Sequence, residues 1–362
     1  MNIVKATRKF ESWLGLQTPL LAADLKCKHR QMAESEFSFL RATFYRWVQI
    51  WPEVCPDLQH APRVLAVGDL HVENFGTWRD TDGRLVWGVN DFDEVSDCPY
   101  TIDLVRLATS AWLAAREGQL SVALKDAAEA ILEGYCAAMK NGGRPFVLGE
   151  EHGWLRLIAE SELRDPVQFW RKIDALPKAG SGVPASARQA IEHLLPEPGL
   201  PYRLARRRAG LGSLGKMRFV GIAQWNGARV AREAKALTAS SIYWLTPDRA
   251  PGEILYSAVS KKAVRSPDPY VQVRGHWIVR RLSPHCSRIE LVDLDRRRDE
   301  LKLLAAMGSE TANIHLGTRK QRKAILKDQR LRKSNWLAES ARSMAKAMEN
   351  DWQNWKKDGQ WR

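Results

Sequence analysis

The spacing of apolar residues predicts where the chain is helical. Before residue 68 the apolar positions recur at helical spacing, and one face of the expected helix carries Phe37, Leu40, Phe44, Trp47 and Val48. The same spacing predicts further helices over 100–115, 120–140, 299–316 and 335–355. We therefore expect both end regions of the chain to be mainly helical.

Strands are predicted where short apolar runs meet turn residues. Val64 to Val67 reads as a buried strand that Gly68 ends, and Arg84 to Val89 reads as another strand. Asp82-Gly83 precedes the second run as a plausible turn, so we expect a hairpin to join these two strands.

A second group of strands is predicted further along the chain. The runs 217–225 and 228–237 flank Asn226-Gly227, which is a strong two-residue hairpin signal, and 270–282 adds more strand-like sequence. Strands in this region, between helical regions, predict an α+β fold.

Polar side chains follow both strands of the first pair. Asp69 and Asn74 come soon after the first strand, and Asp91 and Asp93 come directly after the second. Paired strand ends bring such groups within a few ångströms of one another. Two carboxylates that close repel unless a metal ion or a shared proton lies between them. A hard cation such as Mg²⁺ would take Asp91 and the amide oxygen of Asn74 as ligands and leave Asp69 free.

The alternative for these acids is purely structural. Each one, taken singly, is equally consistent with a side chain that caps a turn and accepts hydrogen bonds from backbone amides. The spacing of the whole set, DxHxxN followed by NDFD, favours a functional site.

A glycine-rich segment supplies a candidate phosphate-binding loop. Gly210, Gly212 and Gly215 have GxGxxG spacing, and this segment leads from strand to strand, whereas a dinucleotide-binding loop would lead into a helix. The backbone amides and Ser213 could contact phosphate oxygens. A glycine-rich hairpin without a ligand is the alternative.

Charge and composition narrow the class of protein. The 362 residues carry a formal net charge of +14, which favours acidic partners, and residues 319–333 contribute eight basic residues and one acid. That segment lacks interleaved aromatic residues, so a solvated helix face is favoured over a nucleic-acid site. Five scattered cysteines and the lack of any apolar run of roughly 20 residues indicate a cytoplasmic protein with no membrane partner.

The first acidic motif resembles a known catalytic loop. GDLHVEN is similar to the loop of aminoglycoside and choline phosphotransferases, which are protein-kinase-like enzymes. The resemblance implies that Asp69 orients or deprotonates the acceptor hydroxyl and that Asn74 binds Mg²⁺. It also implies that Asp91 chelates the metal, with Asp93 as a further candidate ligand, and that Asp103 anchors the loop.

A closer resemblance is to an uncharacterised bacterial family, domain of unknown function 2252. The segments SEFSFLRATFYRW (35–47), GDLHVENFG and NDFDE carry it. That family has no assigned function, so the likeness implies no substrate.

A kinase-like enzyme needs a lysine on the strand that returns from the glycine-rich hairpin. Counting from Gly215 places Arg232 at that position, where the related family usually has lysine. Lys235 lies three residues on and faces the opposite side of a regular strand. We rank Arg232 first as the phosphate ligand, and Lys235 second if the strand bulges. The departure from lysine leaves open whether the protein is catalytically active.

The catalytic motif precedes the glycine-rich loop, which reverses the usual kinase order. We therefore expect a two-lobed, circularly permuted protein-kinase-like fold. Its parts would be a helical catalytic lobe over 1–200 with the acidic hairpin at 64–94, a nucleotide lobe over 201–290, and helices over 291–362 that return to the catalytic lobe. The segment near 283–291 would cross between the lobes.

The function expected from these features is ATP- and Mg²⁺-dependent phosphoryl transfer to a hydroxyl of an unknown small-molecule or protein acceptor. One alternative is a nucleotide-binding pseudokinase or scaffold that uses its basic surface on nucleic acid or a partner protein. Adenylyl transfer is a third reading, because it would use the same residues.

Overall fold

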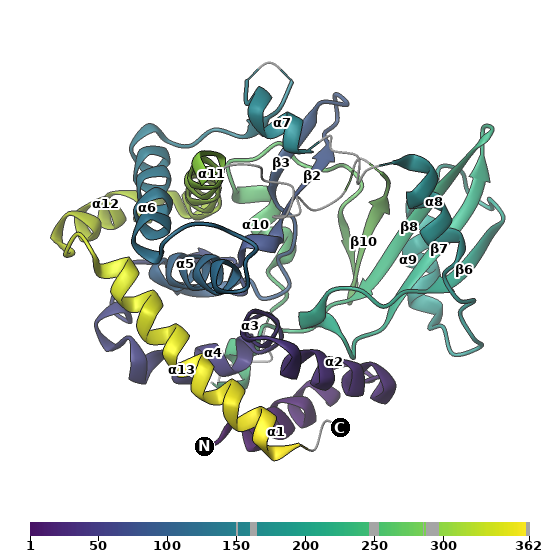
Figure 1. Cartoon of the computed structure of the whole chain (residues 1–362). Coiled ribbons are helices and arrows are strands. Elements are labelled where there is room, and N and C mark those ends of the chain that lie inside the picture. Colours follow the sequence, from purple (N-terminus) through teal and green to yellow (C-terminus); the bar gives the residue numbers. More distant parts are fainter. Residues whose placement is uncertain (150, 160–164, 246–252, 285, 287–296, 360–362) are drawn as a thin grey trace.

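The structure is a computed structural model that describes residues 1–149, 151–159, 165–245, 253–284, 286 and 297–359. A helical part and a five-stranded antiparallel sheet lie side by side (Figure 1). The predicted α+β class is confirmed. No helix within these described ranges is both long and apolar enough to cross a bilayer.

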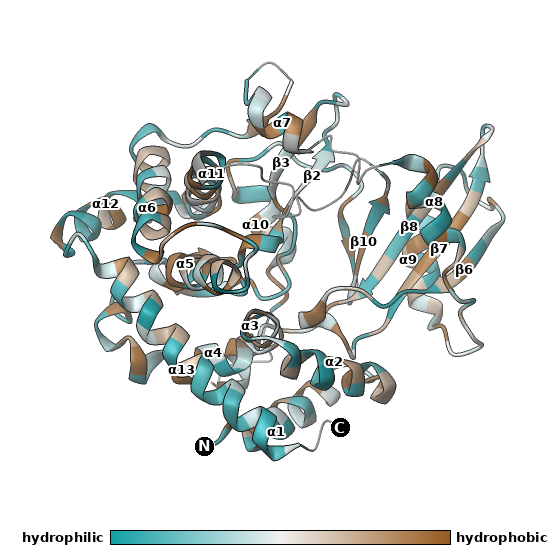
Figure 2. Ribbon diagram, in the orientation of Figure 1, coloured by the Kyte–Doolittle hydropathy of each residue, from teal (hydrophilic) through white to brown (hydrophobic). Residues whose placement is uncertain are grey.

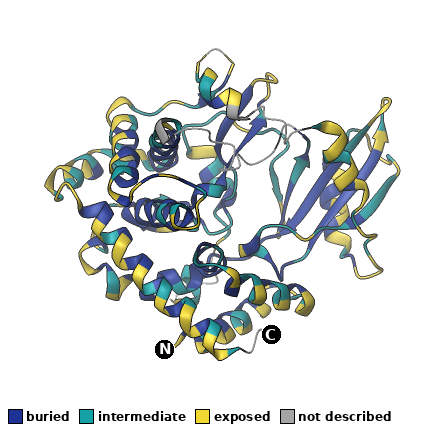
Figure 3. Ribbon diagram, in the orientation of Figure 1, coloured by how far each residue is buried: buried dark blue, intermediate teal, exposed yellow. Residues whose placement is uncertain are grey.

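The helical part is built around a central helix, α5, which is predominantly hydrophobic in Figure 2. Its neighbours come from both ends of the chain, and Figure 3 shows buried and exposed positions alternating along one of them, α13. The helices of this part are α1 (Ile3–Gly15), α2 (Ala22–Glu34), α3 (Glu36–Ala42), α4 (Phe44–Val54), α5 (Thr101–Arg116), α6 (Leu124–Asn141), α7 (Gly153–Ala159), α10 (Tyr256–Lys262), α11 (Arg297–His315), α12 (Arg322–Leu331) and α13 (Trp336–Asp358). The helices predicted over 100–115, 120–140, 299–316 and 335–355 are thus confirmed as α5, α6, α11 and α13.

The five-stranded sheet has the order β6-β7-β8-β10-β9. Its strands are β6 (Tyr202–Arg206), β7 (Arg218–Trp225), β8 (Ala228–Ala236), β9 (Gln272–Arg274) and β10 (Trp277–Leu282). Asn226 and Gly227 join β7 to β8 with φ of 46° and 78°. Positive φ at both central residues is what a tight two-residue hairpin turn requires, so this turn is confirmed.

Two helices cover the sheet. The helix α9 (Ala185–Leu194) packs on the face that carries Phe219 and Val279, and Ile173 of α8 (Pro166–Asp174) packs on Val220 and its neighbours. The expected boundary at residue 200 had assigned both helices to the catalytic lobe, whereas the structure places them with the sheet. Their apolar residues show the same spacing whichever partner they cover, so periodicity alone did not assign them.

The pairing of the first strands differs from the prediction. β1 (Arg63–Ala66) pairs with β4 (Ser96–Pro99), and β3 (Leu85–Val89) pairs with β2 (Phe75–Arg79) and with β5 (Phe146–Val147). The hairpin expected between 64–67 and 84–89 is therefore wrong. The missed strand β2 has consecutive buried residues in place of alternation, so its period gave no signal.

The expected permutation concerns the two ends of the chain and the segment that connects the two lobes. α1 packs against α13, so the two end helices are neighbours. The segment 283–291, which was expected to cross between lobes, lies largely outside the described residues. The basic segment 319–333 contains the end of a short 3₁₀ turn and the whole of α12.

Candidate active site

The loop after β1 is held in place by a buried aspartate. Asp103 of α5 accepts hydrogen bonds from the amides of Val67 (2.7 Å) and Gly68 (2.8 Å), and His315 lies 2.9 Å from the same carboxylate. Gly68 has φ of +85°, and a Cβ there would lie 2.5 Å from the carbonyl oxygen of Glu94. The structural role expected for Asp103 is confirmed.

Asn74 joins the two acidic segments. It ends the 3₁₀ turn η2 (Val72–Asn74), and its side-chain oxygen accepts a hydrogen bond from the amide of His71 at 2.6 Å. The amide of Asn90 donates to the backbone oxygen of Asn74 at 3.0 Å. The end of β3 and the polar loop are therefore adjacent, although β1 and β3 are not paired.

Asp69 is fixed by a buried arginine that the sequence did not single out. Arg106 has no solvent exposure, donates through Nε to Asp69 Oδ1 at 2.9 Å, and also bonds the carbonyl of Leu40. Burial raises the pKa of Asp69 to about 7 even though Arg106 opposes the shift. One carboxylate oxygen is thus held by Arg106. The only sequence signal was the position of Arg106 three residues after Asp103, toward one face of α5.

The glycine-rich turn lies against Asp69. A Cβ placed on Gly212 would be 3.4 Å from Asp69 Oδ2 and 3.0 Å from the carbonyl oxygen of Arg41, so the backbone of the turn closely approaches the loop that follows β1. Gly210 and Gly215 have φ of +74° and +101°, and Ser213 lies between them in the 3₁₀ turn η4 (Leu211–Ser213). These residues are separated from Asp69 by about 140 positions in the sequence.

Helix α2 holds this turn in place. Lys28 is buried and donates to the carbonyl oxygen of Gly212 at 3.2 Å. Just before the helix, the amide of Leu21 donates to the carbonyl oxygen of Gly215 at 2.9 Å. Asp24 pairs with Arg206 (2.8 Å) and Arg208 (2.5 Å), which lead into the turn. The turn is therefore attached to the helical part of the protein as well as to the sheet.

Lys235 forms ion pairs with Asp91 and Asp93, the two aspartates that follow β3. Its Nζ lies 2.8 Å from Asp93 and 3.2 Å from Asp91. Burial and the charge of Asp91 raise the pKa of Asp93. Burial also acts to raise the pKa of Asp91, but the positive charges of Lys235 and the nearby arginines outweigh this effect, and the pKa of Asp91 is lowered.

Arg232, ranked first from the sequence, faces away from these acids. Its guanidinium donates to the carbonyls of Leu194 (2.7 Å) and Ala231 (3.0 Å) and lies over the ring of Tyr270. Lys235 and Arg232 are three residues apart on β8, so they project from opposite faces of the sheet. Lys235 reaches the acids without the expected strand bulge, because the β7–β8 register is continuous.

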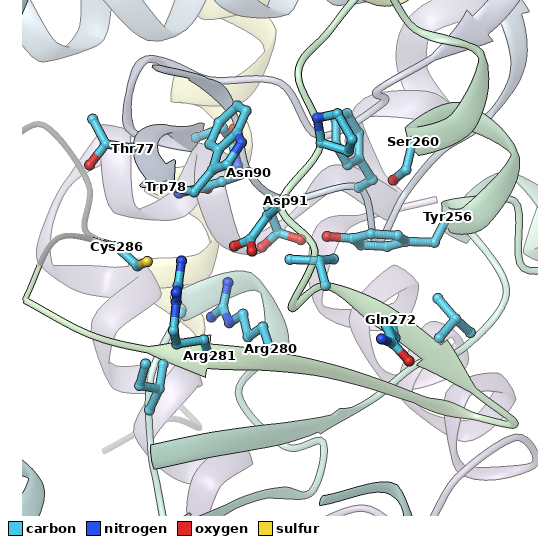
Figure 4. A pocket seen from close by; sticks show the side chains of 18 of the residues that line it. Thr77, Trp78, Asn90, Asp91, Tyr256, Ser260, Gln272, Arg280, Arg281 and Cys286 are labelled. Atoms are coloured by element: carbon cyan, nitrogen blue, oxygen red, sulfur yellow. The ribbon is translucent and has the colours of Figure 1, made fainter. Parts of the chain in front are cut away.

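A cavity of about 980 Å³ opens between the sheet and the acidic segments (Figure 4). Asn74, Asp91 and Gly210 line it and also line a narrower space of about 50 Å³ beside Asp69. Eight lysine and arginine side chains line the large cavity, against three acidic ones. Its surface therefore suits an anionic ligand.

The donor set fits a Mg²⁺ ion that is completed by a substrate. Asp91, Asp93 and the amide of Asn74 provide two carboxylates and one neutral oxygen, and Mg²⁺ is commonly held by one or two carboxylates together with phosphates and water. The buried ammonium group of Lys235 already lies beside both carboxylates, so this position attracts a cation. Within the described ranges, no three His, Cys, Asp or Glu side chains form a metal-binding group.

A comparison with known proteins finds a family that matches part of the chain. Residues 20–156 match the family described as "Uncharacterized protein conserved in bacteria (DUF2252)". This range includes Asp69, Asn74, Asp91 and Asp93 but not the glycine-rich turn or Lys235. No curated protein and no solved structure matches the chain.

Proposed function

We propose that the protein is an ATP- and Mg²⁺-dependent phosphotransferase with a circularly permuted protein-kinase-like arrangement, and that it acts on a hydroxyl group of its acceptor. The proposal rests on one observation above all. The glycine-rich turn lies against Asp69, and Lys235 reaches Asp91 and Asp93, so two distant segments enclose one site.

The order of elements in the sheet supports this proposal. In protein kinases a glycine-rich hairpin covers the phosphates and the nucleotide-binding lysine is on the third strand. Here the glycine-rich turn joins β6 to β7, and Lys235 is on β8, the third strand of this sheet along the chain. The contact between α1 and α13 supports the permutation, because rearrangement of this kind is easiest where the two ends of a domain lie close together.

The residues have distinct roles in the proposed reaction. Asp69 Oδ2 accepts the proton of the acceptor hydroxyl, while Arg106 holds Oδ1 and fixes the orientation of the carboxylate. The acceptor oxygen forms a bond to the terminal phosphorus, the bond from that phosphorus to the bridging oxygen breaks, and ADP leaves. Asn74, Asp91 and Asp93 would hold Mg²⁺, which when bound neutralises charge on the phosphate oxygens.

An acceptor reaches Asp69 only if the glycine-rich turn moves. The space beside Asp69 is about 50 Å³, which leaves room for only a few water molecules. The turn is attached by Lys28 and Leu21, both on the helical side of the site. We propose that its displacement accompanies substrate binding, as with other active-site loops.

The test is transfer of label from radioactive ATP, as hydrolysis or autophosphorylation, by wild type and by Asp69→Asn. We expect transfer from the γ position and a loss of about 100-fold or more in Asp69→Asn. The control is Asp97→Asn, because Asp97 is an exposed residue on β4 that pairs with Arg63. Transfer of label from the α position would instead support adenylyl transfer, and equal activity of wild type and Asp69→Asn would remove Asp69 from the reaction.

A further inference from the structure

Three arginine side chains converge on one buried carboxylate beside the cavity. Glu233 of β8 has no solvent exposure, and it pairs with Arg280 (2.8 Å), Arg218 (3.3 Å) and Arg207. These three residues, named here the arginine cluster, all line the 980 Å³ cavity. None of the three lies in a motif that marks a binding site in the sequence.

The arginine cluster has more positive charge than its anchor neutralises. One carboxylate faces three guanidinium groups, while Asp91, whose charge also acts on Arg218 and Arg280, is itself paired with Lys235. The side chains of Arg207 and Arg280 are 28% and 27% exposed, so part of each guanidinium group is open to the cavity. Each group has five N–H donors, and the contacts with Glu233 use only some of them.

The arginine cluster also lies between the two parts of the proposed site. Arg218 donates to the hydroxyl of Ser213 in the glycine-rich turn at 2.7 Å, and it is opposite Lys235 in the β7–β8 register. Figure 4 shows Arg280 extending from β10 toward Asp91. An anion bound by the cluster would therefore lie next to the turn, Lys235 and Asp91 together.

We propose that the arginine cluster is the principal binding site for the polyphosphate chain of the donor, and that it selects a triphosphate over a monophosphate. Guanidinium groups bind phosphate oxygens through paired hydrogen bonds, and Glu233 holds the three groups in place before the ligand arrives. The inference rests on the proposed phosphotransferase function, but it assigns to three arginines a role that the resemblance gives to loop amides and one lysine.

The direct test uses inorganic tripolyphosphate in EDTA, so that no metal contributes to binding. Isothermal titration calorimetry would compare wild type with Arg280→Gln and Arg207→Gln. We expect each variant to bind tripolyphosphate about ten-fold or more weakly, because each loses a charge-assisted contact. Arg207 lies in the loop after β6 and is partly exposed, so Arg207→Gln keeps the test valid if Arg280→Gln does not fold.

Two matched controls separate this site from general attraction to a basic protein. Arg229 is also on β8 but pairs with Asp174, and Lys323 is exposed on α12. Arg229→Gln and Lys323→Gln are expected to bind tripolyphosphate within about two-fold of wild type. Inorganic phosphate is expected to bind wild type at least ten-fold more weakly than tripolyphosphate, in line with multiple contacts.

The outcomes distinguish this inference from the proposed function. Unchanged affinity in both arginine-cluster variants, equal weakening in the controls, or no binding by wild type would overturn the inference. The labelled-ATP assay with Asp69→Asn is independent of these results. Weakened tripolyphosphate binding without any transfer of label would keep the anion site and reject the phosphotransferase.

Discussion

Lys235 Nζ lies 2.8 Å from Asp93 Oδ1, although the two residues are 142 positions apart in the chain. A buried lysine that bridges acidic residues at the edge of a cavity is well placed to bind phosphate oxygens once a cation joins the acids. The contact favours Lys235 over Arg232 as the candidate phosphate ligand on β8, because Arg232 projects from the opposite face of the sheet.

Substitution of Lys235 and of Arg232 should therefore have different effects. We expect Lys235→Met to lower kcat/KM for ATP by about 100-fold or more, since a placed charge is lost from the site. Arg232→Met should retain activity but lower the free energy of unfolding by about 1–3 kcal/mol, because the carbonyl of Leu194 loses its buried donor. Steady-state kinetics and urea unfolding measure the two effects. The reverse pattern would restore Arg232 as the phosphate ligand.

Asp69 should give the reaction a pH dependence. Its pKa is raised to about 7, so the carboxylate that accepts a proton is depleted below that pH. We expect kcat/KM to rise with pH up to about 7 and then level off. A flat profile between about pH 5.5 and 8.5 would contradict the role of Asp69 as a base.

The same group affects stability in the opposite direction. A carboxyl whose pKa is higher in the folded state than in the unfolded state binds its proton more tightly when folded. Its stabilising contribution is complete below about pH 4 and is lost as the pH rises through about 7. The free energies of unfolding of wild type and Asp69→Asn across this pH range measure this contribution. We expect the stability of wild type relative to Asp69→Asn to be lowest at high pH.

Removal of the loop anchor should destabilise the protein. Asp103→Ala leaves the amides of Val67 and Gly68 buried without their acceptor, which we expect to cost about 2–5 kcal/mol in the free energy of unfolding. Asp97→Ala is the control, because its exposed ion pair with Arg63 should contribute less than about 1 kcal/mol. Similar losses in both variants would mean that Asp103 is not a special anchor.

The sequence predicted the positions of helices and strands better than it predicted which of them pair or pack together. The helices with long apolar stripes and the Asn226-Gly227 hairpin were found, because each signal is local. The strand β2 was missed because its consecutive buried residues show no alternation, and its partner β3 was therefore wrongly paired with β1. The placement of α8 and α9 on the sheet likewise depended on contacts that periodicity does not encode.

The candidate site was predicted in part for the same reason. Asp69, Asn74 and Asp91 lie in short motifs whose spacing is visible along the chain. Arg106 and Lys28 act through contacts 37 and 184 positions away, and the arginines that pair with Glu233 come from three different segments, so no local pattern marks these residues. Counting from Gly215 favoured Arg232 because it could not show which face of β8 borders the acids.

The most direct measurement is a crystal structure with a non-hydrolysable ATP analogue and Mg²⁺. We expect the triphosphate to lie in the 980 Å³ cavity, between the glycine-rich turn and the end of β3, with the metal on Asp91 and the terminal phosphate toward Asp69. A cavity that stays empty at saturating nucleotide, or a nucleotide bound elsewhere on the protein, would contradict the proposal that these two segments form one phosphotransfer site.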